Sequence, residues 1–378
     1  MSIMSVGSCI LGYADEEIDN SVIDAIKKGV NSSLNCPEEV KLAEKLIDLH
    51  PWFHMVRYAR SGGEANAIAI RIARAASGRD KVAICGYHGW HDWYLSANLS
   101  DDKGLDGHLL PGLQPNGVPR NLKNTVFPFN YNQIDELETL VKEHDIGVIK
   151  MEVARSTGPE NNFLQKVRQL ATDNDIVLVF DECTTGFRET FGGLHKKYKV
   201  EPDMAMFGKA LGNGYAITAI IGRKEVMDAA QTTFISSTFW TERIGPTAAL
   251  KTLEVMQREK SWEKITRIGN QISDIWMKLS KKYKIPITIY GLPALIKMRF
   301  ESELNLEYKT LISQEMLKRG YLASNSVYVC TEHNEDVLQG YEEALDQVFS
   351  LISECEQGRS INEFLEGEVC NKDFRRLS

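Results

Sequence analysis

The stretch from residue 176 to residue 214 reads IVLVFDECTTGFRETFGGLHKKYKVEPDMAMFGKALGNG. Its first six residues form an apolar strand that ends in Asp181, and Lys209 follows 28 positions later, just past a second short strand at 203–207. Ligands of open parallel sheets bind beyond the carboxyl ends of the strands, so we expect both side chains at one crevice. We interpret this stretch as a cofactor site.

A βαβ unit leads into the stretch. Apolar periodicity predicts, in chain order, a helix at 134–143, a strand at 146–153, a helix at 162–174 and the strand 176–181. This order is typical of a parallel sheet. Glu152 closes the earlier of the two strands, so its carboxylate is expected beside Asp181. One more short strand is predicted at 217–221.

A glycine turn lies further upstream. A predicted strand at 55–59 runs into Ser61, Gly62 and Gly63, after which apolar residues recur at helical spacing. The free N–H groups and the dipole at such a helix start bind anions, and glycine lets a phosphate approach closely. The alternative is a tight turn that binds nothing.

Aromatic and imidazole groups follow the next predicted strand, at 81–85. The segment 86–93 reads GYHGWHDW, in which Tyr87 or His88 could stack on a flat ligand ring. His88 and His91 are three residues apart and the HExxH pattern is absent, so we predict no metal site.

The chain is long enough for one large domain and a smaller one. We expect an N-terminal helical segment at 1–50, a large cofactor-binding domain at 51–256 and a small α/β domain at 257–378. The density of Gly, Pro and Asn at 101–132 predicts a long loop, and such loops are often lids. Because the chain opens on apolar residues without a cap or strand, we also expect that a preceding segment is missing.

Composition narrows the class of protein. A net charge of −8 and a pI near 5.6 disfavour a nucleic-acid binder. Seven scattered cysteines without metal-ligand spacing are typical of reduced thiols. The sequence shows no signal peptide and no run of about 18 apolar residues that would cross a membrane. We therefore expect a cytoplasmic enzyme that acts without nucleic acid or membrane.

Together these parts are what a pyridine cofactor requires. An aspartate facing the ring nitrogen keeps it protonated, so that the ring can act as an electron sink. A lysine that has lost its proton condenses with a carbonyl to form a Schiff base. The glycine turn supplies a phosphate cradle and Tyr87 a stacking ring.

Four motifs in order, RSGGEANAIAIRIARAASGRDKV, GYHGWHD, FDECTTGFRETFGG and FGKALGNG, resemble the class III aminotransferases over roughly residues 5 to 370. The glutamate-1-semialdehyde aminomutase branch and relatives from sugar-biosynthesis clusters are most similar. The resemblance implies the α/β architecture of PLP-dependent fold type I, with pyridoxal 5'-phosphate (PLP/PMP) as cofactor, and it implies a homodimer whose sites are shared. By position it implies two catalytic residues, Lys209 as the Schiff-base lysine and Asp181 as the partner of the pyridinium nitrogen. It implies that Gly62 and Gly63 contact the cofactor phosphate and that Tyr87 and Cys183 contact the two faces of the ring. Thr238 is expected to contact the phosphate of the neighbouring subunit's cofactor. Ser61, His88 and Glu152 complete the expected cofactor-binding set.

The chain departs from the family at several places. Gly63 stands where the phosphate loop usually has threonine, and Thr184 where many members have a glutamine. Members that use ω-amino acids have a glutamate near Thr157 and a C-terminal arginine for the α-carboxylate, but 322–337 contains no arginine. The chain also begins tens of residues later than is usual.

We therefore expect a PLP-dependent aminotransferase that moves an amino group from an amine donor to a keto or aldehyde acceptor, of the sugar type or a small keto compound. Lys209 would carry the proton between substrate and cofactor. Two alternatives stay open: intramolecular transfer of the glutamate-1-semialdehyde 2,1-aminomutase type, and a catalytically silent protein of the same fold. A nicotinamide-binding fold is disfavoured because GxGxxG never follows a strand.

Overall fold

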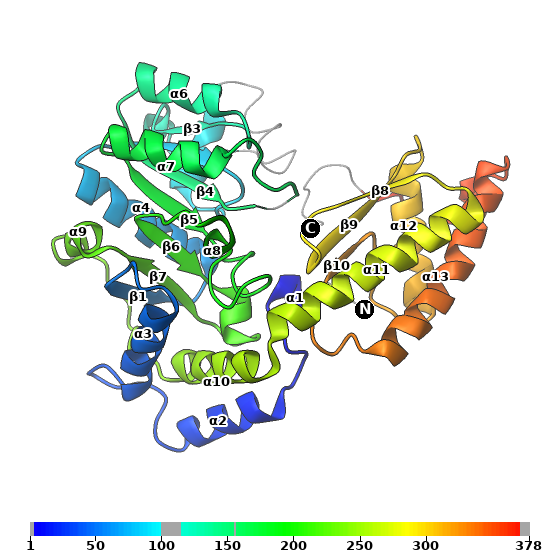
Figure 1. Ribbon diagram of the computed structural model, residues 1–378, viewed down its shortest axis with the longest axis horizontal. Coiled ribbons are helices and arrows are strands. Elements are labelled where there is room, and N and C mark those ends of the chain that lie inside the picture. Colours follow the sequence, from blue (N-terminus) through cyan, green and yellow to red (C-terminus); the bar gives the residue numbers. More distant parts are fainter. Residues whose placement is uncertain (1–3, 100–114, 155, 371–378) are drawn as a thin grey trace.

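The computed structural model describes residues 4–99, 115–154 and 156–370. Within these ranges a seven-stranded sheet has the order β1-β7-β6-β5-β4-β2-β3 (Figure 1). Its strands are β1 (Met55–Ala59), β2 (Lys81–Cys85), β3 (Val126–Pro128), β4 (Ile146–Glu152), β5 (Val177–Asp181), β6 (Met204–Phe207) and β7 (Thr218–Gly222). Strands β3, β2, β4, β5 and β6 are parallel, whereas β7 is antiparallel to β1 and β6. The predicted mostly parallel sheet is confirmed.

Helices cover both faces of this sheet. Helix α4 (Gly62–Ser77) packs on one face, and α6 (Ile134–Glu143) and α7 (Phe163–Asp173) pack on the other (Figure 1). Every residue of the interior strand β4 is consequently buried. A strand covered on two faces needs apolar side chains in both directions, which explains the nearly continuous apolar run at 146–151.

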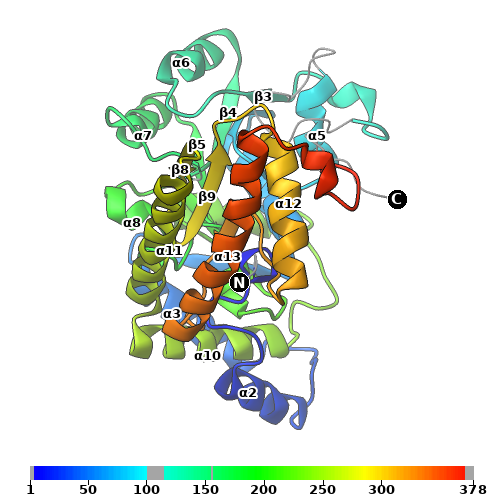
Figure 2. The ribbon, with the colours of Figure 1, turned by 90° about the vertical axis from the view of Figure 1, so that its right-hand side faces the viewer.

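A second, antiparallel sheet has the order β10-β9-β8, from β8 (Ile287–Tyr290), β9 (Leu295–Phe300) and β10 (Ser326–Tyr328). Three long helices accompany it: α11 (Ser261–Tyr283), α12 (Asn305–Lys318) and α13 (Glu335–Glu356). Figure 2 shows α11, α13 and α12 side by side in front of the strands. This small sheet with its helices agrees with the predicted fold class.

The remaining helices flank the two sheets. They are α1 (Met4–Gly7), α2 (Glu16–Ile26), α3 (Pro37–Leu49), α5 (Asp92–Leu95), α8 (His195–Tyr198), α9 (Lys224–Met227) and α10 (Ile244–Glu259). Helix α10 packs against α2 and α3, and one apolar cluster continues from there into the helices of the small sheet. The division at residues 50 and 256 stays a prediction.

The predicted loop at 101–132 is wrong in its second half. Residues 126–128 form β3, which pairs in parallel with β2, and a short 3-10 turn precedes it at Arg120–Leu122. Gly, Pro and Asn around this short strand conceal its apolar residues in the sequence. The first half of the predicted loop, at 101–114, lies outside the described residues.

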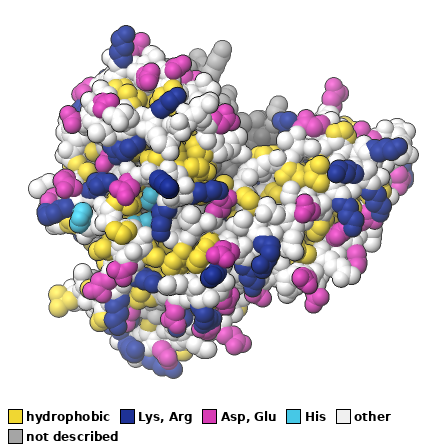
Figure 3. All heavy atoms as spheres, viewed as in Figure 1, with side chains coloured by type: hydrophobic (Ala, Val, Ile, Leu, Met, Phe, Trp, Pro, Cys, Tyr) yellow, Lys and Arg dark blue, Asp and Glu magenta, His cyan; other side chains and the backbone are white. Residues whose placement is uncertain are grey.

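Acidic and basic side chains are interspersed on the face shown in Figure 3, without an extended area of one sign. In the described part of the chain, no helix combines the length and the apolar character that crossing a membrane requires.

Candidate active site

The carboxyl ends of β4, β5 and β6 bring the predicted residues to one edge of the large sheet. In the strand register Glu152 pairs with Asp181, and Asp181 with Met206. Lys209 follows two residues after β6 ends. The sequence-based prediction that Glu152, Asp181 and Lys209 meet at this edge agrees with the topology.

Asp181 is buried and heavily hydrogen-bonded. Its Oδ2 lies 2.9 Å from Nδ1 of His88, and its Oδ1 accepts a hydrogen bond of 3.1 Å from the backbone N–H of Cys183. Burial alone would raise the pKa of Asp181, but attraction from Lys150 and the hydrogen bond from His88 outweigh it and hold that pKa well below its usual range. The site therefore keeps a buried carboxylate ionised.

Lys209 lies in the turn after β6, close to Cys183 and Thr184. Its Nζ donates a hydrogen bond of 2.7 Å to Oγ1 of Thr184, and burial lowers its pKa. Its backbone φ of 45° lies in the left-handed region, which is uncommon for a residue with a side chain and concentrates at functional sites. A Cβ at Gly208 would lie 2.9 Å from Thr218, so only glycine fits before the lysine.

The glycine turn forms as predicted. Ser61 is the N-cap of α4, and its Oγ accepts a hydrogen bond from the N–H of Glu64. Gly62 has open space where a side chain would begin, whereas a Cβ at Gly63 would lie 3.1 Å from the ring of His91. The N-terminus of a four-turn helix is thus available to an anion, with His91 beside it.

Tyr87 and His88 follow β2 and differ in environment. Tyr87 is 37% exposed and packs edge-on against Tyr94, whereas His88 is fully buried. Oε2 of Glu152 accepts a hydrogen bond of 3.1 Å from the N–H of Tyr87. In this structure Glu152 therefore holds the turn that presents Tyr87.

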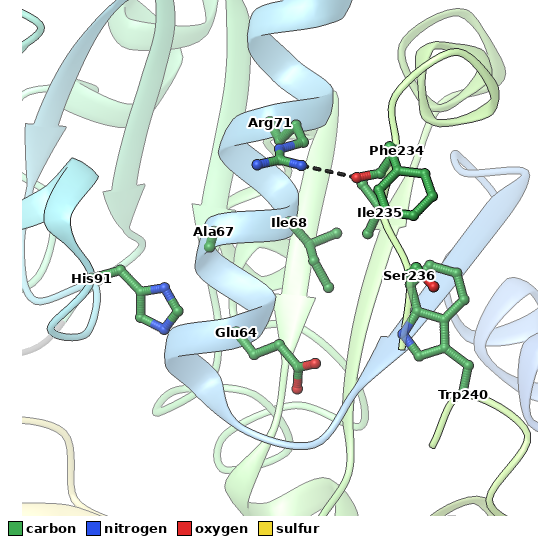
Figure 4. Close-up of a pocket in the computed structure, with 9 residues that line it drawn as sticks. All are labelled: Glu64, Ala67, Ile68, Arg71, His91, Phe234, Ile235, Ser236 and Trp240. Carbon is green, nitrogen blue, oxygen red and sulfur yellow. Dashed lines mark hydrogen bonds between the residues drawn. The ribbon is translucent and has the colours of Figure 1, made fainter. Parts of the chain in front are cut away.

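Among the described residues, Thr238 makes no hydrogen bond to the other predicted site residues. It lies on the exposed segment 234–240, and its carbonyl oxygen accepts a hydrogen bond from Asn31. A cavity of about 260 Å³ is lined by residues of this segment and of α4, and by His91. Figure 4 shows the segment with Trp240 on one side of α4 and His91 on the other. The contact of Thr238 with a neighbouring subunit's cofactor stays a prediction.

Sequence reasoning missed Lys150. It lies in β4, is fully buried, and its Nζ is 3.9 Å from Oδ2 of Asp181. The available signal was a lysine inside the apolar run IGVIKME, two residues before Glu152 and therefore on the same face of the strand. The sequence alone does not show that this face is covered by α4.

The residues fit a phosphorylated pyridine. Three buried polar atoms around the edge, Nε2 of His88, Oδ1 of Asn66 and Oγ1 of Thr218, have no hydrogen-bond partner among the described residues. Buried polar groups without partners mark places where a bound group completes the network. No group of three or more potential metal ligands occurs within residues 4–99, 115–154 and 156–370.

Known proteins resemble the chain over nearly its whole length. The family model "Aminotransferase class-III" matches residues 2–334. A 3-aminobutyryl-CoA aminotransferase of Cloacimonas acidaminovorans is 33% identical over 93% of this chain and 84% of its own. A glutamate-1-semialdehyde 2,1-aminomutase of Sulfolobus acidocaldarius is 31% identical over 90% of this chain and 83% of its own.

Solved structures share the fold. The PLP internal aldimine form of the Sphingopyxis FumI protein superposes with a TM-score of 0.86 at 21% identity, covering 96% of this chain and 86% of that one. An omega-transaminase from Sphaerobacter thermophilus gives 0.83 at 23% identity, covering 92% and 86%. With this fold, this site and the match to the family model, the chain belongs to the class III aminotransferases, enzymes that use pyridoxal phosphate.

Proposed function

We propose that the edge formed by β4, β5 and β6 is the cofactor site of this aminotransferase. Lys209 would attach the cofactor covalently, Asp181 would face the ring nitrogen, and the turn at Gly62 and Gly63 would hold the phosphate. When bound, pyridoxal phosphate supplies an electron sink for the substrate's α-bonds. Tyr87 and Cys183 would lie against the two faces of its ring.

One observation carries this proposal: the buried Asp181 carboxylate and the partly buried Lys209 amine both lie near Cys183, and both groups have a lowered pKa. The lowered pKa of Lys209 increases the fraction of free amine, which can attack a carbonyl and later accept and return a proton. The depressed pKa of Asp181 keeps a negative charge where a protonated ring nitrogen needs it. Thr184 holds the lysine Nζ in place.

Replacing Lys209 tests the site. We expect Lys209→Ala to lose the visible absorbance of bound cofactor, because no amine remains to attach it, and to lose at least about 10³-fold in rate, on the order of 4 kcal/mol. Borohydride reduction and peptide mapping of the wild type should place the cofactor on Lys209. Lys142→Ala on exposed α6 is the control. Cofactor attached to another lysine would refute the assignment.

For the substrate we infer an amine on a carbon other than the one next to a carboxylate. Two relatives point this way by name, the 3-aminobutyryl-CoA aminotransferase and a beta-phenylalanine aminotransferase of known structure. The missing arginine at 322–337 agrees, since that side chain would serve an α-carboxylate. These names favour a small keto acceptor over a keto sugar.

The second candidate is intramolecular transfer, which the aminomutase relative supports. A screen separates the two reactions. Purified enzyme is mixed with β-amino acids and their thioesters, with ω-amines, with amino sugars and with glutamate-1-semialdehyde. Transfer between two molecules releases a free keto product and leaves the cofactor in its amine form. Turnover of the semialdehyde alone, without a free keto product, would overturn the transferase proposal.

We further propose a homodimer that works in the cytoplasm. Phe234 and Phe239, on the segment that carries Thr238, are 86% and 58% exposed. Trp90, in the turn after β2, is 70% exposed. Such exposed aromatic groups are typical of a protein interface. The seven cysteines are unpaired, which suits a reducing compartment. Light scattering should give twice the chain mass, and a monomer at micromolar concentration would refute the dimer.

A further inference from the structure

Lys150 is a fully buried lysine within the interior strand β4. Its Nζ lies 3.9 Å from Oδ2 of Asp181 and 3.0 Å from the sulfur of Met206. Among the described residues, Asp181 is the only ion-pair partner of this ammonium group. Lysine is rarely buried completely, and then usually for a specific partner.

The surroundings explain why the side chain cannot reach water. Val148, two residues earlier on the same face of β4, belongs to the apolar cluster that includes α4. The titratable groups that act on Lys150 are Asp181 and Cys183 from β5 and the turn after it, and Glu152 from its own strand. Burial lowers the pKa of Lys150 more strongly than these groups raise it.

Stability does not account for this pair. A buried ion pair costs much of its attraction in lost hydration, and apolar side chains of similar volume often serve as well or better. Met206 and Val148 already line the space with apolar groups. The lysine therefore acts on Asp181, its ion-pair partner.

We propose that Lys150 is a positioning residue for Asp181: its ammonium group pairs with the carboxylate, and when the cofactor binds it weakens the attraction between that carboxylate and the protonated ring nitrogen. This inference rests on the proposed placement of the cofactor, with Asp181 at the ring nitrogen.

The sign of the effect follows from the charges. With a protonated ring nitrogen bound, two cations share the Asp181 carboxylate, and like charges at short range inside a protein repel each other. His88 and the N–H of Cys183 still bind the carboxylate when Lys150 is neutralised, so Asp181 stays ionised. Removing the ammonium group therefore strengthens binding of the protonated ring and raises the pKa of its nitrogen.

The experiment uses pyridoxal phosphate labelled with nitrogen-15 at the ring nitrogen. The NMR shift of this nitrogen is followed against pH in the wild type and in Lys150→Met, and cofactor affinity is measured by titrating the apoenzyme. We expect the variant to keep the nitrogen protonated to a pH about one unit higher and to bind about tenfold more tightly, since one pKa unit is a factor of ten. Lys150→Gln should behave in the same way and serves if the methionine variant does not fold.

Lys142→Met, the same change on exposed α6, should match the wild type. Unchanged nitrogen titration in both neutral variants would overturn the proposal. Weaker cofactor binding by the neutral variants than by the wild type would also overturn it, because Lys150 would then contribute to packing and not through its charge. A wild type that binds no cofactor at Lys209 would instead refute the proposed site itself.

Discussion

Gly63 illustrates how one residue position depends on a neighbour distant from it in the chain. The family commonly has threonine here, whose hydroxyl would reach the phosphate. In this protein the space is bordered by the His91 ring, 3.1 Å from where a Cβ would begin, and by the indole nitrogen of Trp90 at 3.5 Å. The backbone of Gly63 is not in the left-handed region, so the obstacle is steric and not conformational.

We expect Gly63→Thr to bind cofactor about tenfold more weakly, roughly 1.4 kcal/mol, because His91 must move to admit the side chain. In Gly63→Thr combined with His91→Ala, the affinity should return to that of His91→Ala or exceed it. Apoenzyme titrations of the four proteins form a double-mutant cycle. Strictly additive losses would show that the two positions do not interact.

At the scale of the element, α12 carries an ion-pair cluster that is independent of the active site. Glu315 is largely buried and accepts hydrogen bonds of 2.7 Å from Lys318 and from Arg319, one turn further along the helix. Burial alone would raise the pKa of Glu315, but these bonds and one from Gln314 lower it to about 2. The cluster joins the end of α12 to Glu366 through Lys318.

Glu315→Gln should lower the free energy of unfolding by about 1 kcal/mol at pH 7. A carboxyl whose pKa is lower in the folded state stabilises the fold above its unfolded pKa, so this difference should fade as pH falls from 4.5 towards 2. Urea unfolding of both proteins across this pH range measures it. A difference that stays constant to pH 2 would contradict the role given to the charge.

At the scale of the whole molecule, Arg188 links three parts of the chain. Its Nε donates to the carbonyl of Thr184 and its Nη2 to the carbonyl of Gly7, at 2.6 and 2.5 Å, and its guanidinium lies over the ring of Tyr328 in β10. Burial lowers the pKa of Arg188 to about 10, which leaves it charged at neutral pH. One side chain thus connects the N-terminal segment, the turn after β5 and the small sheet.

Arg188→Met should cost about 3 kcal/mol in the free energy of unfolding, since two carbonyl groups lose a buried charged donor. The N-terminal segment should also be cut faster by protease at native temperature. Arg299→Met, which removes an exposed pair with Glu301, is the matched control and should change stability by less than about 0.5 kcal/mol. Equal stability of the two variants would show that Arg188 does not link these parts.

Local patterns were sufficient for most of the architecture and for the centre of the site. Helical and strand periodicity predicted the βαβ unit, and the polar residues at strand ends predicted that Asp181 and Lys209 meet, because parallel strands deliver their carboxyl ends to one edge. The glycine turn before α4 was also readable, since a cap and a helical repeat lie next to each other in sequence.

Only the tertiary structure decided the features that depend on contacts between residues distant in the sequence. The sequence alone determined that Asp181 ends its strand and that Lys209 lies just past the end of another, because these are local properties of each strand. It did not show that α4 buries Lys150 beside Asp181, that His91 crowds Gly63, or that Arg188 reaches Gly7. Burial and contact between distant residues arise from packing, and a periodic pattern records which face is apolar without recording what covers it.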